Sequence, residues 1–179
     1  KAPKDPDCTA YFSIALILTD KYADGKELIE ELLKNPLSAE NASTLIAQGL
    51  LSQKIENDLK KALEHTNKAI ELTPNEPYAW IRRGNIKSDM GDEEGALSDY
   101  DQSLEIDPNI TIGWICRGYT KSELGDKEGA LQDYTKALEI NPQDAEIWFN
   151  RAFEKYDLKD IEGAINDNTK AIEIDPQFA

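Results

Sequence analysis

Few side chains in this sequence of 179 residues have the types and spacing that covalent or acid–base chemistry needs. The single histidine, His65, follows Glu64 in a segment of helical pattern, and we interpret it as a solvated helix residue rather than a catalytic base. Cys8 and Cys116 stand far apart, and no Cys/His pairing of the kind that holds zinc accompanies them. The sequence also lacks a glycine-rich phosphate loop. We therefore expect no enzyme activity, no bound metal and no cofactor.

A second set of side chains recurs every 34 residues, and these residues serve helix packing and partner recognition rather than covalent chemistry. The recurring residues are Trp80, Trp114 and Trp148, then Gly84 and Gly118, then Ala96, Ala130 and Ala164, then Pro108, Pro142 and Pro176. The small residues allow two helices to approach closely, and the tryptophans fill the wedge between neighbouring hairpins. The period predicts an all-α fold, a solenoid of antiparallel helix hairpins in which these residues are structural.

The same period divides the chain into units. Residues 77–110, 111–144 and 145–178 are complete repeats, and residues 43–76 form a divergent repeat. Residues 8–42 are predicted to form a degenerate hairpin, with helices over about residues 8–22 and 26–34 and a turn at Asp24-Gly25. Residues 1–7 are predicted to form a flexible arm.

Turn residues divide each complete repeat into two helices. Gly91-Asp92 and Gly125-Asp126 form the middle turn, and Asp92, Asp126 and Asp160 are expected to cap the second helix. A proline follows each second helix, because the residue before a proline avoids the helical region.

Both ends of the array carry apolar side chains. Residues 10–18 are apolar on nearly every side, which predicts a helix buried between neighbours. No later helix covers Ile165, Ile172 or Ile174, and a solenoid needs a polar cap. We therefore expect that the natural chain continues beyond Ala179, so that the last repeat is truncated, or that this face self-associates.

The net charge of the chain makes some classes of binding partner unlikely. It carries 20 basic and 35 acidic residues, a formal net charge of −15, and this field repels nucleic acid. The apolar run at residues 10–18 is too short to insert across a membrane. Two unpaired cysteines suit a cytoplasmic setting. A secreted or periplasmic protein stays open, because the chain begins at Lys1 rather than Met.

The pattern W-x2-R-G, then A-x3-Y, then P at this period resembles the tetratricopeptide repeat. The sequence departs from that family where Arg83, Arg117 and Arg151 stand in place of leucine. The resemblance implies a right-handed superhelix whose first helices line a concave groove that binds a peptide or a partner helix.

Mapped through the resemblance, the groove presents apolar, aromatic and acidic side chains. Its members are Tyr78, Ile81, Arg82, Asn85, Ile115, Tyr119, Glu123, Phe149, Asn150, Phe153, Tyr156 and Asp157, with Asp89 and Glu146 as further acids. Because Arg82 is the one cation of this set, we expect a neutral-to-basic ligand with apolar anchors.

Three other functions are weighed against this binding module for a protein or peptide. A self-assembling structural array would use the open C-terminal end as its contact. A chaperone-tail clamp of the same family wants groove lysines, but Ile81, Ile115 and Phe149 occupy those positions. An enzyme has no candidate site.

The arginines that replace leucine suggest an ion pair across each hairpin. Arg83, Arg117 and Arg151 are each followed sixteen residues later by an aspartate, namely Asp99, Asp133 and Asp167. We predict that each arginine bonds the aspartate on the second helix of its own hairpin.

Overall fold

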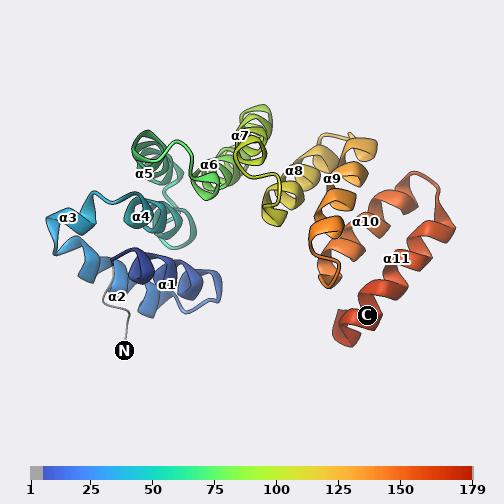
Figure 1. Ribbon diagram of the computed structural model, residues 1–179, viewed down its shortest axis with the longest axis horizontal. Helices are drawn as coiled ribbons and strands as arrows, with labels where there is room; N and C mark the ends of the chain where they lie inside the picture. Colours follow the sequence, from blue (N-terminus) through green and yellow to red (C-terminus); the bar gives the residue numbers. More distant parts are fainter. Residues whose placement is uncertain (1–5, 179) are drawn as a thin grey trace. The chain divides into compact units, whose positions relative to one another are not determined.

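The computed structural model describes residues 6–178, and every regular element in this range is helical (Figure 1). The α-helices are α1 (Pro6–Leu18), α2 (Tyr22–Leu33), α3 (Pro36–Ala39), α4 (Ala42–Lys54), α5 (Leu59–Leu72), α6 (Pro77–Asp89), α7 (Glu93–Ile106), α8 (Thr111–Glu123), α9 (Lys127–Ile140), α10 (Ala145–Asp157) and α11 (Ile161–Ile174), and a short 3-10 helix follows at Pro176–Phe178. Within these residues each helix is too short or too polar to span a bilayer.

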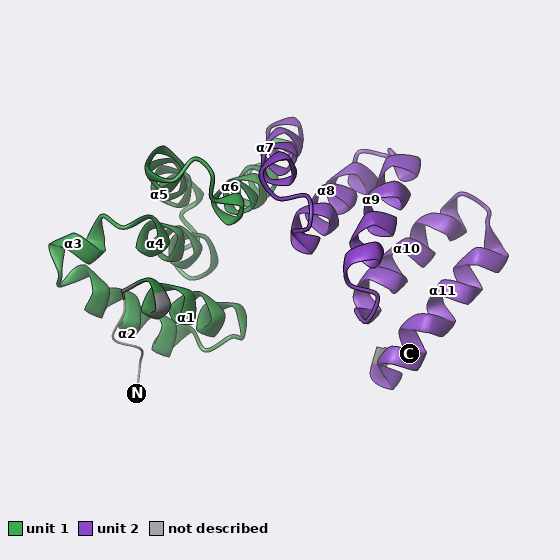
Figure 2. Cartoon of the chain, viewed as in Figure 1, with its two compact units in different colours: residues 1–92 green, residues 93–179 purple. Residues whose placement is uncertain are grey.

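The helices form two compact units, Lys1–Asp92 and Glu93–Ala179 (Figure 2). In the first unit α1 pairs with α2 and α4 with α5; in the second, α8 pairs with α9 and α10 with α11. Consecutive hairpins also touch, since α9 packs on α10 and α1 on α4. The predicted all-α fold of antiparallel helix pairs is therefore confirmed.

The turns between paired helices follow the expected residue chemistry. Gly91 and Gly125 have φ angles of 81° and 84°, which a residue with a side chain rarely adopts. In the last hairpin Lys159 takes the same conformation with φ 71°. Asp126 and Asp160 cap α9 and α11 by accepting the backbone N–H of Gly129 and Gly163. The matching cap by Asp92 falls at the boundary between the units and stays a prediction.

The predicted boundaries of the first hairpin are wrong. Helix α1 begins at Pro6 and ends at Leu18, and α2 already begins at Tyr22, so that the chain turns at Asp20 (φ 60°) and not at Asp24-Gly25. Gly25 instead lies inside α2, where a Cβ atom would approach Ile17 Cγ1 to 2.7 Å. This glycine serves the close approach of α1 and α2 rather than a turn.

Other expectations for this region also need correction. Pro6 and Asp7 belong to α1 and not to an arm, and the rest of the predicted arm, residues 1–5, lies outside the described residues. The burial of α1 on every side is wrong, because Tyr11, Phe12 and Leu18 are about half exposed. The short helix α3 was not predicted from the sequence.

Small residues allow close helix contact as expected. Ala96, Ala130 and Ala164 are buried, and a Cβ on Gly118 would lie 3.1 Å from Tyr134 Cε1 and 3.3 Å from Asp133 Cβ on α9. In the divergent repeat, Gly49 fills this role one position early, since a Cβ there would lie 3.0 Å from Thr66 Cγ2 on α5.

Each tryptophan is held in the same way. The indole N–H groups of Trp80, Trp114 and Trp148 donate to the carbonyl oxygens of Pro74, Pro108 and Pro142, with N···O distances of 2.8, 2.9 and 2.9 Å. Trp114 and Trp148 pack against the core cluster around Tyr134. A guanidinium group lies over every ring, 4.7 to 4.8 Å from the ring centre.

The arginine–aspartate pairs are confirmed in the second unit. Arg117 Nε and Nη2 donate to the two carboxylate oxygens of Asp133 at 2.8 and 2.6 Å, and Arg151 binds Asp167 in the same bidentate form at 2.7 and 2.9 Å. Both aspartates are buried. Arg83 and Asp99 belong to different units, and their pairing stays a prediction.

A second contact of each arginine was not foreseen. Nη1 of the arginine donates to the residue sixteen positions earlier, on the second helix of the preceding hairpin. The three contacts are Arg83 to Asn67 at 3.0 Å, Arg117 to Asp101 at 2.6 Å, and Arg151 to Thr135 at 3.3 Å. Arg117 and Arg151 therefore each join two second helices.

We predict strong energetic coupling between Arg117 and Asp133. Because Asp133 is buried, removal of Arg117 should lower the free energy of unfolding by about 3–5 kcal/mol, and a double-mutant cycle with Arg117→Leu and Asp133→Ala should give a coupling of about 1–3 kcal/mol. The control cycle is the exposed pair Lys136 and Glu139 on α9, for which about 0.2–1 kcal/mol is expected. Equal coupling in both cycles would contradict the structure.

The Asp167 pair predicts how stability depends on pH. Burial raises the pKa of the Asp167 carboxyl, but hydrogen bonds from Arg151 and Lys155 outweigh burial and hold that pKa below its usual value. The carboxylate therefore stabilises the fold fully above the unfolded-state pKa of about 3.9, and this contribution is lost as the pH falls through the folded-state pKa. The stability difference between wild type and Asp167→Asn should shrink below about pH 4 in urea titrations. A difference that stays constant under acid conditions would rule out this role.

Candidate ligand-binding face

Exposed aromatic side chains gather on the first helices of the second unit. On α10, Phe149, Phe153 and Tyr156 are 45%, 54% and 58% exposed, and Tyr119 on α8 is 55% exposed. The spacing of the three α10 residues puts them on one side of that helix. We call these four residues, with the acids Glu123 and Asp157, the α8–α10 face.

A carboxylate ends the first helix of each complete repeat. Asp89, Glu123 and Asp157 are the last residues of α6, α8 and α10, at the repeat period. The C-terminal end of a helix is the negative end of its dipole, so that an acid there is electrostatically unfavourable. Each acid has a hydrogen-bond or ion-pair partner. Gln53 Nε2 donates to Asp89 at 2.6 Å, Tyr119 donates to Glu123, and Lys127 pairs with Asp157.

Lys127, at the start of α9, adds a cation that the mapped groove did not include. Its ammonium group forms an ion pair with Asp157 and lies 5.9 Å from the centre of the Phe153 ring. The hydrogen bond to Asp157 raises the pKa of Lys127. Lys127 therefore brings a cation beside two residues of the mapped set, in addition to Arg82 within that set.

A buried carboxylate lies between α8 and α10. Glu154 is 2% exposed, and its Oε1 atom accepts a hydrogen bond from Ser122 Oγ at 2.5 Å. Its other oxygen, Oε2, is buried and receives no hydrogen bond from the described residues. Glu154 was not predicted from the sequence, although the 34-residue period gives a signal: the equivalent buried positions hold Ile86 and Thr120.

The other predicted groove residues differ in exposure. Ile81 is 2% exposed and does not present its side chain to solvent, so its assignment to an open groove is wrong; α6 packs against both α4 and α5, and an aliphatic side chain is buried there. Ile115 is half-buried against the core cluster of the second unit. The half-buried polar members are Arg82, Asn85 and Asn150, whereas Tyr78, Asp89 and Glu146 are exposed.

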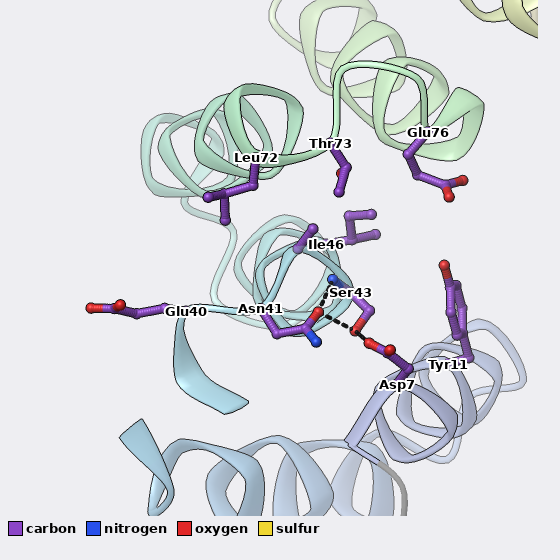
Figure 3. Close-up of a pocket in the computed structure, with 10 residues that line it drawn as sticks. Asp7, Tyr11, Glu40, Asn41, Ser43, Ile46, Leu72, Thr73 and Glu76 are labelled. Atoms are coloured by element: carbon purple, nitrogen blue, oxygen red, sulfur yellow. Dashed lines mark hydrogen bonds between the residues drawn. The ribbon is translucent and has the colours of Figure 1, made fainter. Parts of the chain in front are cut away.

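The first unit holds a separate cavity of about 460 Å³ (Figure 3). Its lining is Asp7, Tyr11, Glu40, Asn41, Ala42, Ser43, Ile46, Leu72, Thr73 and Glu76. Ser43 Oγ lies 2.6 Å from Asp7 Oδ1 and 2.8 Å from Asn41 Oδ1, and the close-up shows Glu40 pointing away from the other side chains. Burial raises the pKa of the Tyr11 phenol, and the charges of Glu76 and Asp7 add to this shift.

The histidine differs from its expected environment. His65 on α5 is half-buried rather than fully solvated, and this burial lowers the pKa of its imidazole. Among residues 6–178, no three Asp, Glu, His or Cys side chains converge in a way that could hold a metal ion. The side chain of Cys8 lies outside the described part, and Cys116 is half-buried on α8.

Comparison with known sequences confirms the family resemblance. Residues 77–110 and 145–178 match the tetratricopeptide repeat, and residues 118–153 match a TPR repeat model. Since these matches together cover more than half of its length, the chain belongs to the tetratricopeptide repeat family. Domains of this family are generally protein–protein interaction modules and are typically non-catalytic.

A more distant similarity connects part of the chain to an import receptor. Mitochondrial import receptor subunit TOM70 of Rattus norvegicus is 33% identical over 97 residues, which cover 52% of this chain and 16% of the receptor. The protein of Homo sapiens is 32% identical over 97 residues with the same coverage. The match thus spans less than a fifth of the length of these relatives.

Solved structures share the fold at low sequence identity. TTC0263, a thermophilic TPR protein of Thermus thermophilus, has a TM-score of 0.79 and 18% identity over 96% of this chain and 92% of its own. MamA has a TM-score of 0.73 and 15% identity over 92% of this chain and 95% of its own. YrrB, a TPR protein with an unusual peptide-binding site, has a TM-score of 0.65 and 19% identity over 96% and 87%.

We predict that Glu154 lowers the stability of the second unit. A buried carboxylate with one unsatisfied oxygen is costly, and an apolar side chain of similar volume removes that cost. Glu154→Met should therefore raise the free energy of unfolding by about 1–3 kcal/mol in urea titrations, because Ser122 at the edge can bond water instead. The control Glu146→Met, at an exposed position on α10, should change stability by about 0.5 kcal/mol or less. A clear loss of stability in Glu154→Met would show that the carboxylate is needed for folding.

Proposed function

We propose that this chain is a binding module that holds a peptide or a helix of a protein partner on the α8–α10 face. The observation that carries this proposal is the group of four exposed aromatic side chains on two first helices of the second unit. Contiguous exposed aromatic surface is typical of protein interaction sites rather than of ordinary solvated surface. Burial of these rings would supply most of the affinity, at about 25 cal/mol per Å² of apolar surface.

The charge of the protein favours a ligand that is neutral to basic. The formal net charge is −15, and acids end the first helices at positions where the helix dipole does not favour them. Such a field speeds the encounter with a cationic segment and disfavours an acidic one. The acidic tail of a chaperone fits poorly for this reason, and because Phe149 and the half-buried Ile115 stand where the clamp needs lysines.

Self-assembly is a second candidate, supported by one observation on α11. Of the three isoleucines expected to be uncovered, Ile165 and Ile172 are exposed, as is Ile161, whereas Ile174 is half-buried. If this face joins copies of the chain, light scattering coupled to gel filtration should give a mass that rises with concentration, and Ile165→Asp should abolish the rise. A constant monomer mass would leave the binding module as the better account.

The binding proposal is tested by selection of random peptides displayed on phage against the chain. Peptides that bind should lose affinity by about 2 kcal/mol or more with Phe153→Ala in calorimetry, because an exposed ring at the centre of the face is the expected anchor. The matched control is Ile165→Ala, which removes an exposed apolar side chain from α11 and should leave the affinity unchanged. If Phe153→Ala leaves the affinity of the selected peptides unchanged, the peptides bind to another surface.

A further inference from the structure

Two carboxylates of α10 and the ammonium group of Lys127 lie near Phe153 in the second unit. Glu154 and Asp157 stand on α10, the first directly after Phe153 and the second about one turn later. Lys127 Nζ pairs with Asp157, and the negative charge of Glu154 also raises the pKa of Lys127. Glu123 on α8 adds a third carboxylate, which accepts a hydrogen bond from Tyr119.

One carboxylate oxygen of Glu154 lacks a hydrogen-bond donor among the described residues. Glu154 is 2% exposed, Ser122 satisfies Oε1 only, and no described donor reaches Oε2. A buried polar atom without a partner is costly, and such groups in native proteins call for a functional explanation. Asp157, by contrast, is half-buried and accessible beside the exposed ring of Phe153.

We infer that the α8–α10 face selects a ligand through one lysine or arginine side chain, which pairs with Asp157 over the ring of Phe153. The ligand cation then replaces Lys127 at Asp157, and Lys127 turns to donate to the open oxygen of Glu154. Each of the two carboxylates has its own cation in the complex, and the ring face of Phe153 receives a cation in both states. Glu154 is therefore a residue that determines specificity without touching the ligand.

The inference rests on the proposed function, since it assumes that the ligand binds this face. It adds a second requirement for the ligand: besides apolar anchors, the ligand needs one cationic side chain at a fixed position beside them. A ligand with a neutral side chain at this position would leave the oxygen of Glu154 unsatisfied, and one with a carboxylate would add a like charge.

The test uses the peptides selected on phage against the whole chain. Lysine or arginine should occur at one fixed position relative to the apolar residues. Synthetic versions of one peptide, with lysine, norleucine or glutamate at that position, are then compared by calorimetry. The wild-type chain should bind the lysine peptide about tenfold more tightly than the norleucine peptide.

Two variants and one control separate the role of Glu154 from effects on folding. Glu154→Thr copies the residue at the equivalent Thr120, and Asp157→Asn removes the direct partner; both should reduce the preference for lysine to about threefold or less. Glu173→Gln makes the same change of charge at an exposed position on α11, outside the mapped groove, and should keep the preference. Thermal unfolding of each variant checks that the fold is retained.

The outcomes are distinguishable. Peptides that depend on Phe153 but show no preference for lysine or arginine, or a preference that survives both variants, overturn this inference and leave the proposed function standing. A selection that gives no peptide dependent on Phe153 overturns the proposed function and this inference with it.

Discussion

One arginine in the first helix of a hairpin joins two second helices in the second unit, through hydrogen bonds to both. Arg117 binds Asp133 on α9 through two parallel hydrogen bonds, reaches Asp101 on α7 with its third nitrogen, and stacks on Trp114. A planar guanidinium group can satisfy all these partners at once, which neither leucine nor lysine can do. Arg151 repeats the arrangement on α10. The wedge between hairpins is thus filled by a stack of ring and guanidinium rather than by aliphatic packing.

This network also determines which charges are left for a ligand. In the last hairpin Arg151 and Lys155, one turn apart on α10, both bind the buried Asp167. The cations of α10 are therefore paired with Asp167 on α11. Phe149, Phe153 and Asp157 on the same helix remain partly or largely exposed. In this hairpin the basic side chains of α10 thus pair internally, whereas its aromatic rings are exposed to solvent.

The period of the sequence predicted most of the fold, because tryptophan, glycine and proline each have one physical role at a fixed place in the hairpin. The first hairpin was predicted less well, since Gly25 serves close packing there and not a turn. The site was predicted in part. Exposure of Tyr119 and Phe153 followed from the mapped helix face, whereas burial of Ile81 depends on which neighbouring helices cover it. Lys127 could not be placed, because its contact with Asp157 joins different helices. The burial of Glu154 could have been predicted from the repeat period, but its contact with Ser122 on α8 could not.

The central claim is that a ligand binds the aromatic side of the first helices and not the side that carries the tryptophans. Aromatic side-chain resonances provide the direct measurement, in nuclear magnetic resonance spectra recorded with and without a peptide selected on phage. If the ligand binds there, the signals of Phe149, Phe153, Tyr156 and Tyr119 should shift, while the indole signals of Trp114 and Trp148 stay in place. Shifts of the indole signals with unchanged phenylalanine signals would contradict this claim.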